Sequence, residues 1–135
     1  MSFRLATTAA VAAIIAMPGS AGAQVLMERN VSVHMALTIA ETALAECGTR
    51  VSVAVVDRAG RLRVFLQGDG AAPHNIELAR RKAYTARTFR MTTEEFIKAL
   101  EANPARRAQT TLPHVIAIPG GVPIKVGRAS CRERV

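Results

Sequence analysis

The part of this sequence with the greatest potential for ligand chemistry is a dense run of nitrogen donors between residues 80 and 90. The side chains in the run are Arg80, Arg81, Lys82, Arg87 and Arg90. Guanidinium and ammonium groups donate charge-assisted hydrogen bonds, so together they could bind the carboxylates of a ligand. The alternative is a solvated helix face, and the spacing alone leaves both interpretations open.

Other side chains that could act in catalysis or bind a metal are scattered along the chain. His34, His74 and His114 show no metal-ligand spacing, and Asp57 and Asp69 form no recognisable acid–base set with them. The sequence has neither a Walker-type loop nor a GxGxxG pattern. Each histidine is therefore predicted to be structural or solvent-exposed, with metal ligation as the alternative. Nothing here indicates a nucleophile paired with a base.

The composition indicates one basic domain. The 135 residues include 18 Lys and Arg against 10 Asp and Glu, which gives a net charge of +8. A basic domain could meet nucleic acid, anionic lipid or a small anionic ligand. With one Tyr and no Trp, the chain has few rings on which bases could stack, so no nucleic-acid partner is expected.

Both ends of the sequence differ in character from the middle. Residues 1–23 carry Arg4, then an apolar run and then small residues, the order of a secretory signal peptide cleaved before Gln24. A membrane anchor is the alternative, but the apolar run is shorter than the ~20 residues that a span needs. The mature chain is expected to be periplasmic or secreted, without a membrane span. Residues 127–135 have no periodicity and resemble a non-native cloning scar; a genuine basic tail is the alternative.

Hydrophobic periodicity predicts a helix over residues 31–47. The predicted core face consists of Val33, Leu37, Ala40, Leu44 and Cys47, with His34 off that face. Gly48 suits the position just after the helix end. Cys47 has no partner once the tail is set aside, so no disulfide framework is expected. We predict a small buried apolar role for Cys47, with a reactive thiol as the alternative.

Residues 51–86 form the block around which the chain is organised. Apolar residues alternate over 51–55 and 61–67, which predicts two strands joined by a tight hairpin at 57–60. Residues 68–73 form a close-packed glycine-rich crossing. The helix that follows has a narrow face of small residues, so it is expected to approach a sheet closely.

The second half of the chain is predicted to complete the sheet. Thr92 and Glu95 form a capping box that opens a third helix, and a polar loop follows over 105–113. Strands are predicted over 114–118 and 122–126, around a tight turn at 119–121. The order helix–strand–strand–helix–helix–strand–strand has no βαβ repeat, so it favours an α+β fold with an antiparallel sheet.

The segments VAVVD, GDGAAP, KAYTA and GGVPI together resemble the GlcG/HbpS haem-binding family over residues 31–126. The resemblance implies a profilin-like α+β fold, with a central antiparallel sheet flanked by helices. It also implies assembly into a homo-oligomer and binding of haem or another tetrapyrrole. Because C-x-x-C-H is absent, any haem would be noncovalent. Family members continue with a glycine-rich strand and a closing helix. Residues 24–126 are therefore expected to be an incomplete domain that lacks its last strand and helix.

The resemblance also suggests which residues meet the ligand. Carried over by position, the residues expected near the ligand or in the pocket wall are Lys82, Thr85, Gly120, Gly121 and Pro123. Lys82 with Arg81 could pair with haem propionates, and the glycines would let a flat ligand approach the main chain. For the iron, we expect His34 and His74 as the candidate ligands.

Three functions are compatible with these features. The first is an exported haem or tetrapyrrole carrier or sensor. The second is an enzyme that degrades haem or acts on a small metabolite, although no catalytic set is visible. The third is an oligomeric structural or regulatory protein without a cofactor.

Overall fold

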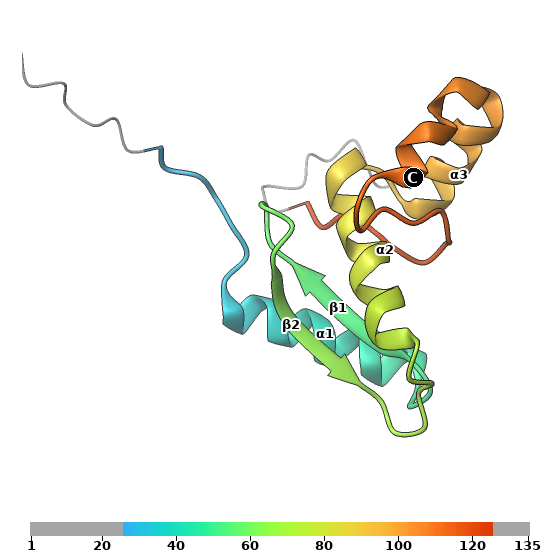
Figure 1. The fold of residues 1–135 in the computed structure, drawn as a ribbon. Coiled ribbons are helices and arrows are strands. Elements are labelled where there is room, and N and C mark those ends of the chain that lie inside the picture. Colours follow the sequence, from blue (N-terminus) through green and yellow to red (C-terminus); the bar gives the residue numbers. More distant parts are fainter. Residues whose placement is uncertain (1–25, 126–135) are drawn as a thin grey trace, which may run out of the picture.

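Two antiparallel strands lie at the centre of the computed structural model, which describes residues 26–125 (Figure 1). The elements are α1 (Val33–Cys47), β1 (Ser52–Val56), β2 (Leu62–Gln67), α2 (Asn75–Phe89), α3 (Thr93–Ala102) and the 3₁₀ helix η1 (Pro104–Thr111). The fold is therefore α+β, as predicted. The predicted signal peptide at 1–23 and the predicted tail at 127–135 lie outside the described residues.

The hairpin between β1 and β2 forms where the sequence predicted it. One carboxylate oxygen of buried Asp57 accepts hydrogen bonds from the main-chain N–H groups of Ala59 and Arg61, at 2.8 and 2.9 Å. Gly60 has a φ of 77°, which a residue with a side chain rarely adopts. Any side chain there would also meet the ring of Tyr84 from α2. The two hydrogen bonds to Asp57 and the main-chain conformation of Gly60 therefore stabilise the turn.

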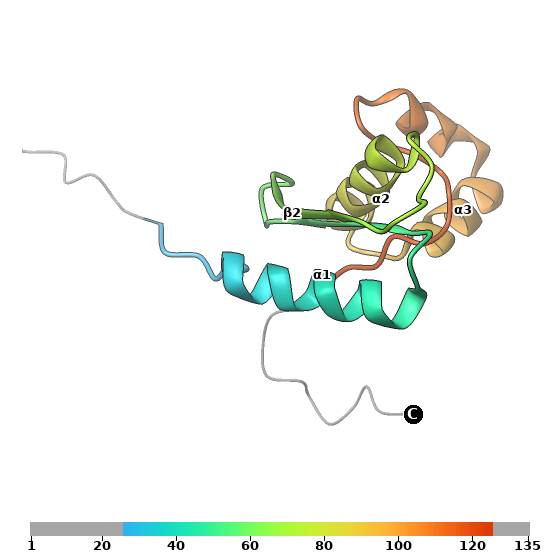
Figure 2. The same ribbon diagram turned by 90° about the horizontal axis from the view of Figure 1, so that it is seen from below.

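Helices cover both faces of the hairpin. Figure 2 shows the two strands edge-on, with α1 on one side and α2 on the other. On the α1 side, Ala36, Ala40 and Val55 form a buried cluster with Val31. Small residues at this contact let the helix axis come close to the sheet.

The predicted core face of α1 is wrong in part. Ala36 and Ala40 are fully buried, whereas Val33 and Leu37 are 54% and 37% exposed. The helix packs through its row of alanines because close contact with the sheet leaves no room for larger side chains. Cys47 is exposed, contrary to its predicted buried role, because it lies in the last turn, beyond the buried alanines.

A second hydrophobic cluster holds the C-terminal part of the described chain. Phe96, Leu100 and Val115 are buried together, and the ring of Phe96 stacks on that of Phe89 with centroids 4.2 Å apart. The predicted capping box at the start of α3 is confirmed. This cluster joins α2, α3 and the segment that follows η1.

Residues 114–118 and 122–125 do not form the predicted strands. Side chains of α2 bind this segment instead: Arg81 donates to the carbonyl of Val115 at 2.7 Å, and the Thr85 hydroxyl accepts from the N–H of Ile116 at 2.9 Å. The described sheet therefore has two strands. The predicted loop at 105–113 is also corrected, because η1 occupies most of it, with Pro104 in its first turn.

No helix within residues 26–125 has the length and hydropathy that a membrane span requires; α1 and α2, for example, have 15 residues each.

We expect Thr92→Ala to lower the free energy of unfolding by about 1 kcal/mol, because Thr92 caps α3. Hydrogen bonds from the main chain and hydroxyl of Thr92 hold the pKa of Glu95 below its ordinary value of 4.5. A carboxyl whose pKa is lower in the folded state stabilises the fold above its unfolded value, and this contribution is lost as the pH falls through the folded value. The difference in the free energy of unfolding between the wild type and Thr92→Ala should therefore become smaller as the pH falls. Urea unfolding at neutral and acidic pH measures it. Thr92→Ser keeps the hydroxyl and should unfold like the wild type.

Candidate ligand-binding groove

A groove runs along the outer edge of β1, the edge that does not pair with β2. Two adjoining cavities form it, a wide end of about 740 Å³ and a narrow end of about 370 Å³. Ala54 of β1, Ala83 of α2 and Val122 line both ends. We call this feature the β1 groove.

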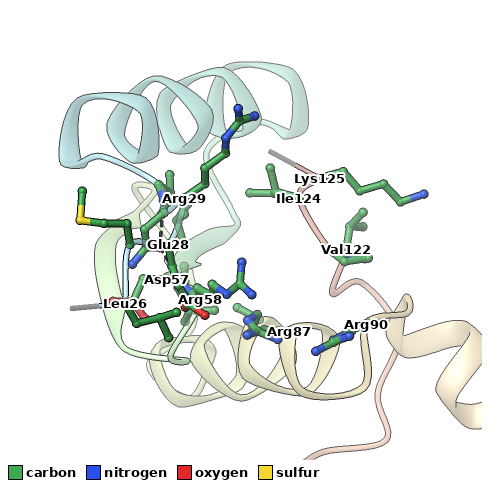
Figure 3. A pocket seen from close by; sticks show the side chains of 18 residues that line it. Leu26, Glu28, Arg29, Asp57, Arg58, Arg87, Arg90, Val122, Ile124 and Lys125 are labelled. Carbon is green, nitrogen blue, oxygen red and sulfur yellow. Dashed lines mark hydrogen bonds and ion pairs between the residues drawn. The ribbon is translucent and has the colours of Figure 1, made fainter. Parts of the chain in front are cut away.

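The wide end combines apolar surface with cationic side chains (Figure 3). Its exposed apolar side chains are Leu26, Met27, Val122 and Ile124. Its cationic side chains are Arg29, Arg58, Arg87, Arg90 and Lys125. The arrangement suits a ligand that has an apolar body and anionic groups.

The segment before α1 is fixed to the hairpin turn, which gives the wide end one of its walls. The side-chain oxygen of Asn30 accepts from the N–H groups of Val31 and Arg58, at 2.9 and 3.0 Å. Arg58 also forms an ion pair with Glu28 at 3.0 Å. Glu28 and Arg58 therefore neutralise each other, and residues 28–30 are held beside the groove.

Arg87 and Arg90 stand at the end of α2, and Figure 3 shows both on the side of the helix that faces the wide end. Arg90 terminates the helix in a left-handed conformation, with a φ of 57°. Among the described residues, no carboxylate lies within ion-pair distance of Arg87, Arg90 or Arg29. The wide end thus has three guanidinium groups that are free to bind anions.

The narrow end brings together three of the residues that the family resemblance selected, Lys82, Gly120 and Gly121. A Cβ on Gly121 would lie 2.5 Å from the carbonyl oxygen of Lys82, and one on Gly120 would lie 3.6 Å from its ammonium nitrogen. Gly121 also exchanges two 2.9 Å hydrogen bonds with Thr93, one from each N–H group. The glycines therefore allow the segment to press against α2. Pro123, a fourth such residue, lines the wide end.

Arg81 and Thr85 lie outside the lining of both ends. The Thr85 hydroxyl is fully buried; it donates to the carbonyl of Arg81 at 2.8 Å while it accepts from Ile116. With Arg81 bound to Val115, both side chains anchor the C-terminal segment to α2. Their predicted contact with a ligand stays a prediction.

The predicted iron ligands are also outside the lining of the groove. His34 is exposed on α1, and His74 is exposed at the start of α2. His114 lies 2.9 Å from the guanidinium of Arg80, so its Nδ1 acts as acceptor, and its ring meets Tyr84 edge-on. No group of three His, Cys, Asp or Glu in the described part of the chain could hold a metal ion.

Sequence reasoning missed Met27 and Arg29 as groove residues. Met27 carries the only sulfur that lines the wide end among the described residues, and a thioether is a known haem ligand. Residues 24–30 have no periodicity, so nothing in the sequence placed them beside β1. For Arg87 and Arg90, the density of cations along α2 was the available signal.

The chain belongs to the HbpS-like family. Residues 30–131 match the family model described as "Haem degrading protein HbpS-like", which confirms the resemblance seen in the sequence. A comparison with curated proteins found no match.

Solved structures agree with this assignment. The chain is 33% identical to HbpS, with a TM-score of 0.69 over 80% of this chain and 77% of that one. It is 32% identical to a double mutant of Streptomyces reticuli HbpS, with a TM-score of 0.68 over 89% and 80% of the two chains. The Klebsiella pneumoniae protein ORFY is 20% identical, with a TM-score of 0.64 over 79% and 77%, and shows the fold alone.

Proposed function

We propose that this protein binds haem or a related tetrapyrrole noncovalently at the wide end of the β1 groove. The observation that carries the proposal is a set of three arginines, Arg29, Arg87 and Arg90, that form no ion pair within residues 26–125. They surround a cavity of about 740 Å³ with apolar side chains in its walls. The family description and the name HbpS support the ligand class. We further propose that the protein acts outside the cytoplasm as a homo-oligomeric carrier or sensor.

The residues of the wide end fit the chemistry of haem. Arg87 and Arg90 are one helical turn apart, so their guanidinium groups can each bind one propionate. Val122 and Ile124 can cover part of the ring with apolar surface. Bound haem would supply an iron centre for coordination or redox chemistry.

Met27 is the side chain of the wide end best suited to the iron. A thioether is a soft ligand, so it should hold ferrous haem better than ferric haem. Its main chain is close to the anchored residues 28–30, and its side chain is 89% exposed and therefore not committed to the protein core.

Titration of the purified protein with haemin tests the proposal. We expect a saturable shift of the Soret band with one haem per chain. Met27→Ala should alter the spectrum of the ferrous complex, whereas His34→Ala and His74→Ala should leave it unchanged. Folded protein that gives no Soret shift would exclude haem binding. If a histidine variant alone changed the spectrum, that histidine would be the iron ligand instead.

Haem degradation is a second candidate, because the family model carries that description. The same complex tests it after addition of ascorbate in air. Loss of the Soret band with formation of a biliverdin-like product would identify a degrading enzyme. A Soret band that persists would leave binding as the function.

A further inference from the structure

The wide end of the β1 groove has cationic side chains on two sides. Arg87 and Arg90 stand on α2, whereas Arg29 belongs to the segment before α1. Figure 3 shows Arg29 beside α1, across the wide end from the two arginines of α2. The arginines of α2 are sufficient for the two propionates of haem. Arg29 is therefore a cation that a ligand with two carboxylates does not use.

The contacts of its two neighbours in the sequence hold Arg29 on its side of the wide end. The side-chain oxygen of Asn30 accepts hydrogen bonds from the N–H groups of Val31 and Arg58, at 2.9 and 3.0 Å. Glu28 forms an ion pair with Arg58 at 3.0 Å. The residues before and after Arg29 are thus both bound to the hairpin turn. The main chain of Arg29 therefore has a fixed place across the wide end from α2.

Two other cations line the wide end, and both have acidic neighbours. Arg58 is engaged by Glu28. Lys125 acts on Glu95: hydrogen bonds from Thr92 have the largest effect in lowering the pKa of Glu95, and the charge of Lys125 lowers it further. Among the described residues, the cations left for a ligand at the wide end are therefore three guanidinium groups, two on one wall and one on the other.

The positions of carboxylates around a porphyrin ring decide which ring matches this arrangement. The two propionates of haem are on adjacent pyrrole rings, so both lie at one edge of the macrocycle. Bound to α2 by that edge, haem would direct its apolar vinyl edge toward Arg29. A porphyrin with one propionate on each pyrrole ring has carboxylates on opposite sides of the macrocycle. Such a ring can form charge-assisted hydrogen bonds with both walls, so its charges are complementary to those of the wide end.

We propose that the wide end of the β1 groove selects a porphyrin with four carboxylates, of the coproporphyrin class, over haem. Arg87 and Arg90 bind two of the carboxylates, Arg29 binds a third from the facing wall, and the fourth stays in solvent. This inference rests on the proposed function, because it requires a tetrapyrrole at the wide end. It makes Arg29 the residue that determines specificity among tetrapyrroles.

Soret titrations of the full-length chain with three ferric porphyrins test the proposal. We expect ferric coproporphyrin to bind about tenfold more tightly than haemin. Deuterohaemin has two propionates and no vinyl groups, so it shows the effect of losing the vinyl groups alone, and it should bind no more tightly than haemin. If haemin or deuterohaemin bound as tightly as ferric coproporphyrin, this inference would be overturned and the haem proposal would stand. Folded protein that gave no Soret shift with any of the three would overturn both.

Variants of Arg29 test its role through the ratio of the affinities for ferric coproporphyrin and haemin. Arg29→Ala should lower this ratio about tenfold, and Arg29→Lys should lower it less, because it keeps the charge. Arg29 is exposed, so both variants should keep the circular dichroism of the wild type. Arg107→Ala removes the same charge from η1, outside the groove, and should leave the ratio unchanged. An equal fall of the ratio in Arg107→Ala, or an unchanged ratio in Arg29→Ala, would overturn the inference.

Discussion

Replacing Gly121 by alanine is expected to lower the free energy of unfolding by about 3 kcal/mol. The new Cβ would lie 2.5 Å from the carbonyl oxygen of Lys82 and 2.9 Å from the methyl carbon of Thr93. Neither atom can move away easily, because one belongs to the main chain of α2 and the other to a fully buried side chain. Overpacking of this kind is destabilising by about 1–3 kcal/mol. The two hydrogen bonds between Gly121 and Thr93 would be strained as well, at about 1 kcal/mol each.

Urea unfolding followed by circular dichroism measures this effect. Gly70→Ala is a suitable control, because Gly70 has a φ of 78° but open space around its Cβ position. Gly70→Ala thus reports the cost of the main-chain conformation alone, about 1 kcal/mol. If both variants unfolded alike, contact between Gly121 and α2 would not be what holds the C-terminal segment.

Local signals in the sequence predicted the elements whose causes are local. The hairpin at 57–60 depends on Asp57 and Gly60, and the start of α3 depends on Thr92 and Glu95. In each case the residues that make the hydrogen bonds are at most four positions apart. Such contacts are encoded by residue type and spacing, so they could be read directly.

Predictions that depended on distant contacts were less successful. Hydrophobicity favoured Val33 and Leu37 as core residues of α1, yet the close approach of the sheet selected Ala36 and Ala40. Residues 114–118 have the composition of a strand, but Arg81 and Thr85 bind their main chain from α2. A pattern of apolar residues does not show which partner will satisfy the main chain.

The same limit applies to the candidate site. The family resemblance selected Lys82, Gly120 and Gly121 from the sequence, and all three line the narrow end of the groove. Close packing of a segment on a helix requires glycine, so residue type alone could indicate these positions. The roles of Arg29 and Met27 depend on where an aperiodic segment lies. The ion pair that fixes this segment joins Glu28 to Arg58, 30 residues later in the hairpin turn. Whether an arginine is unpaired is also a property of the folded chain.

Simultaneous replacement of Arg87 and Arg90 by alanine is expected to weaken haemin binding about 100-fold. A hydrogen bond to a charged group contributes about 1.5–3 kcal/mol when desolvated, and solvent reduces this at the half-buried Arg87 and the exposed Arg90. About tenfold for each arginine, or ~1.4 kcal/mol, is therefore a reasonable expectation. Neither side chain has a partner among the described residues, so their loss should leave the free energy of unfolding nearly unchanged. This separates a ligand-binding role from a structural one.

Soret titrations with two matched controls complete the test. Arg107→Ala removes an exposed arginine of η1 that is outside both ends of the groove, and it should bind haemin like the wild type. The double variant Arg87→Lys with Arg90→Lys keeps both charges but loses the planar, bidentate contact with a carboxylate. Its affinity for haemin should therefore lie between that of the wild type and that of the double alanine variant. An affinity of the double alanine variant equal to that of Arg107→Ala would show that the propionates bind elsewhere. Lys82 at the narrow end would then be the next cation to replace.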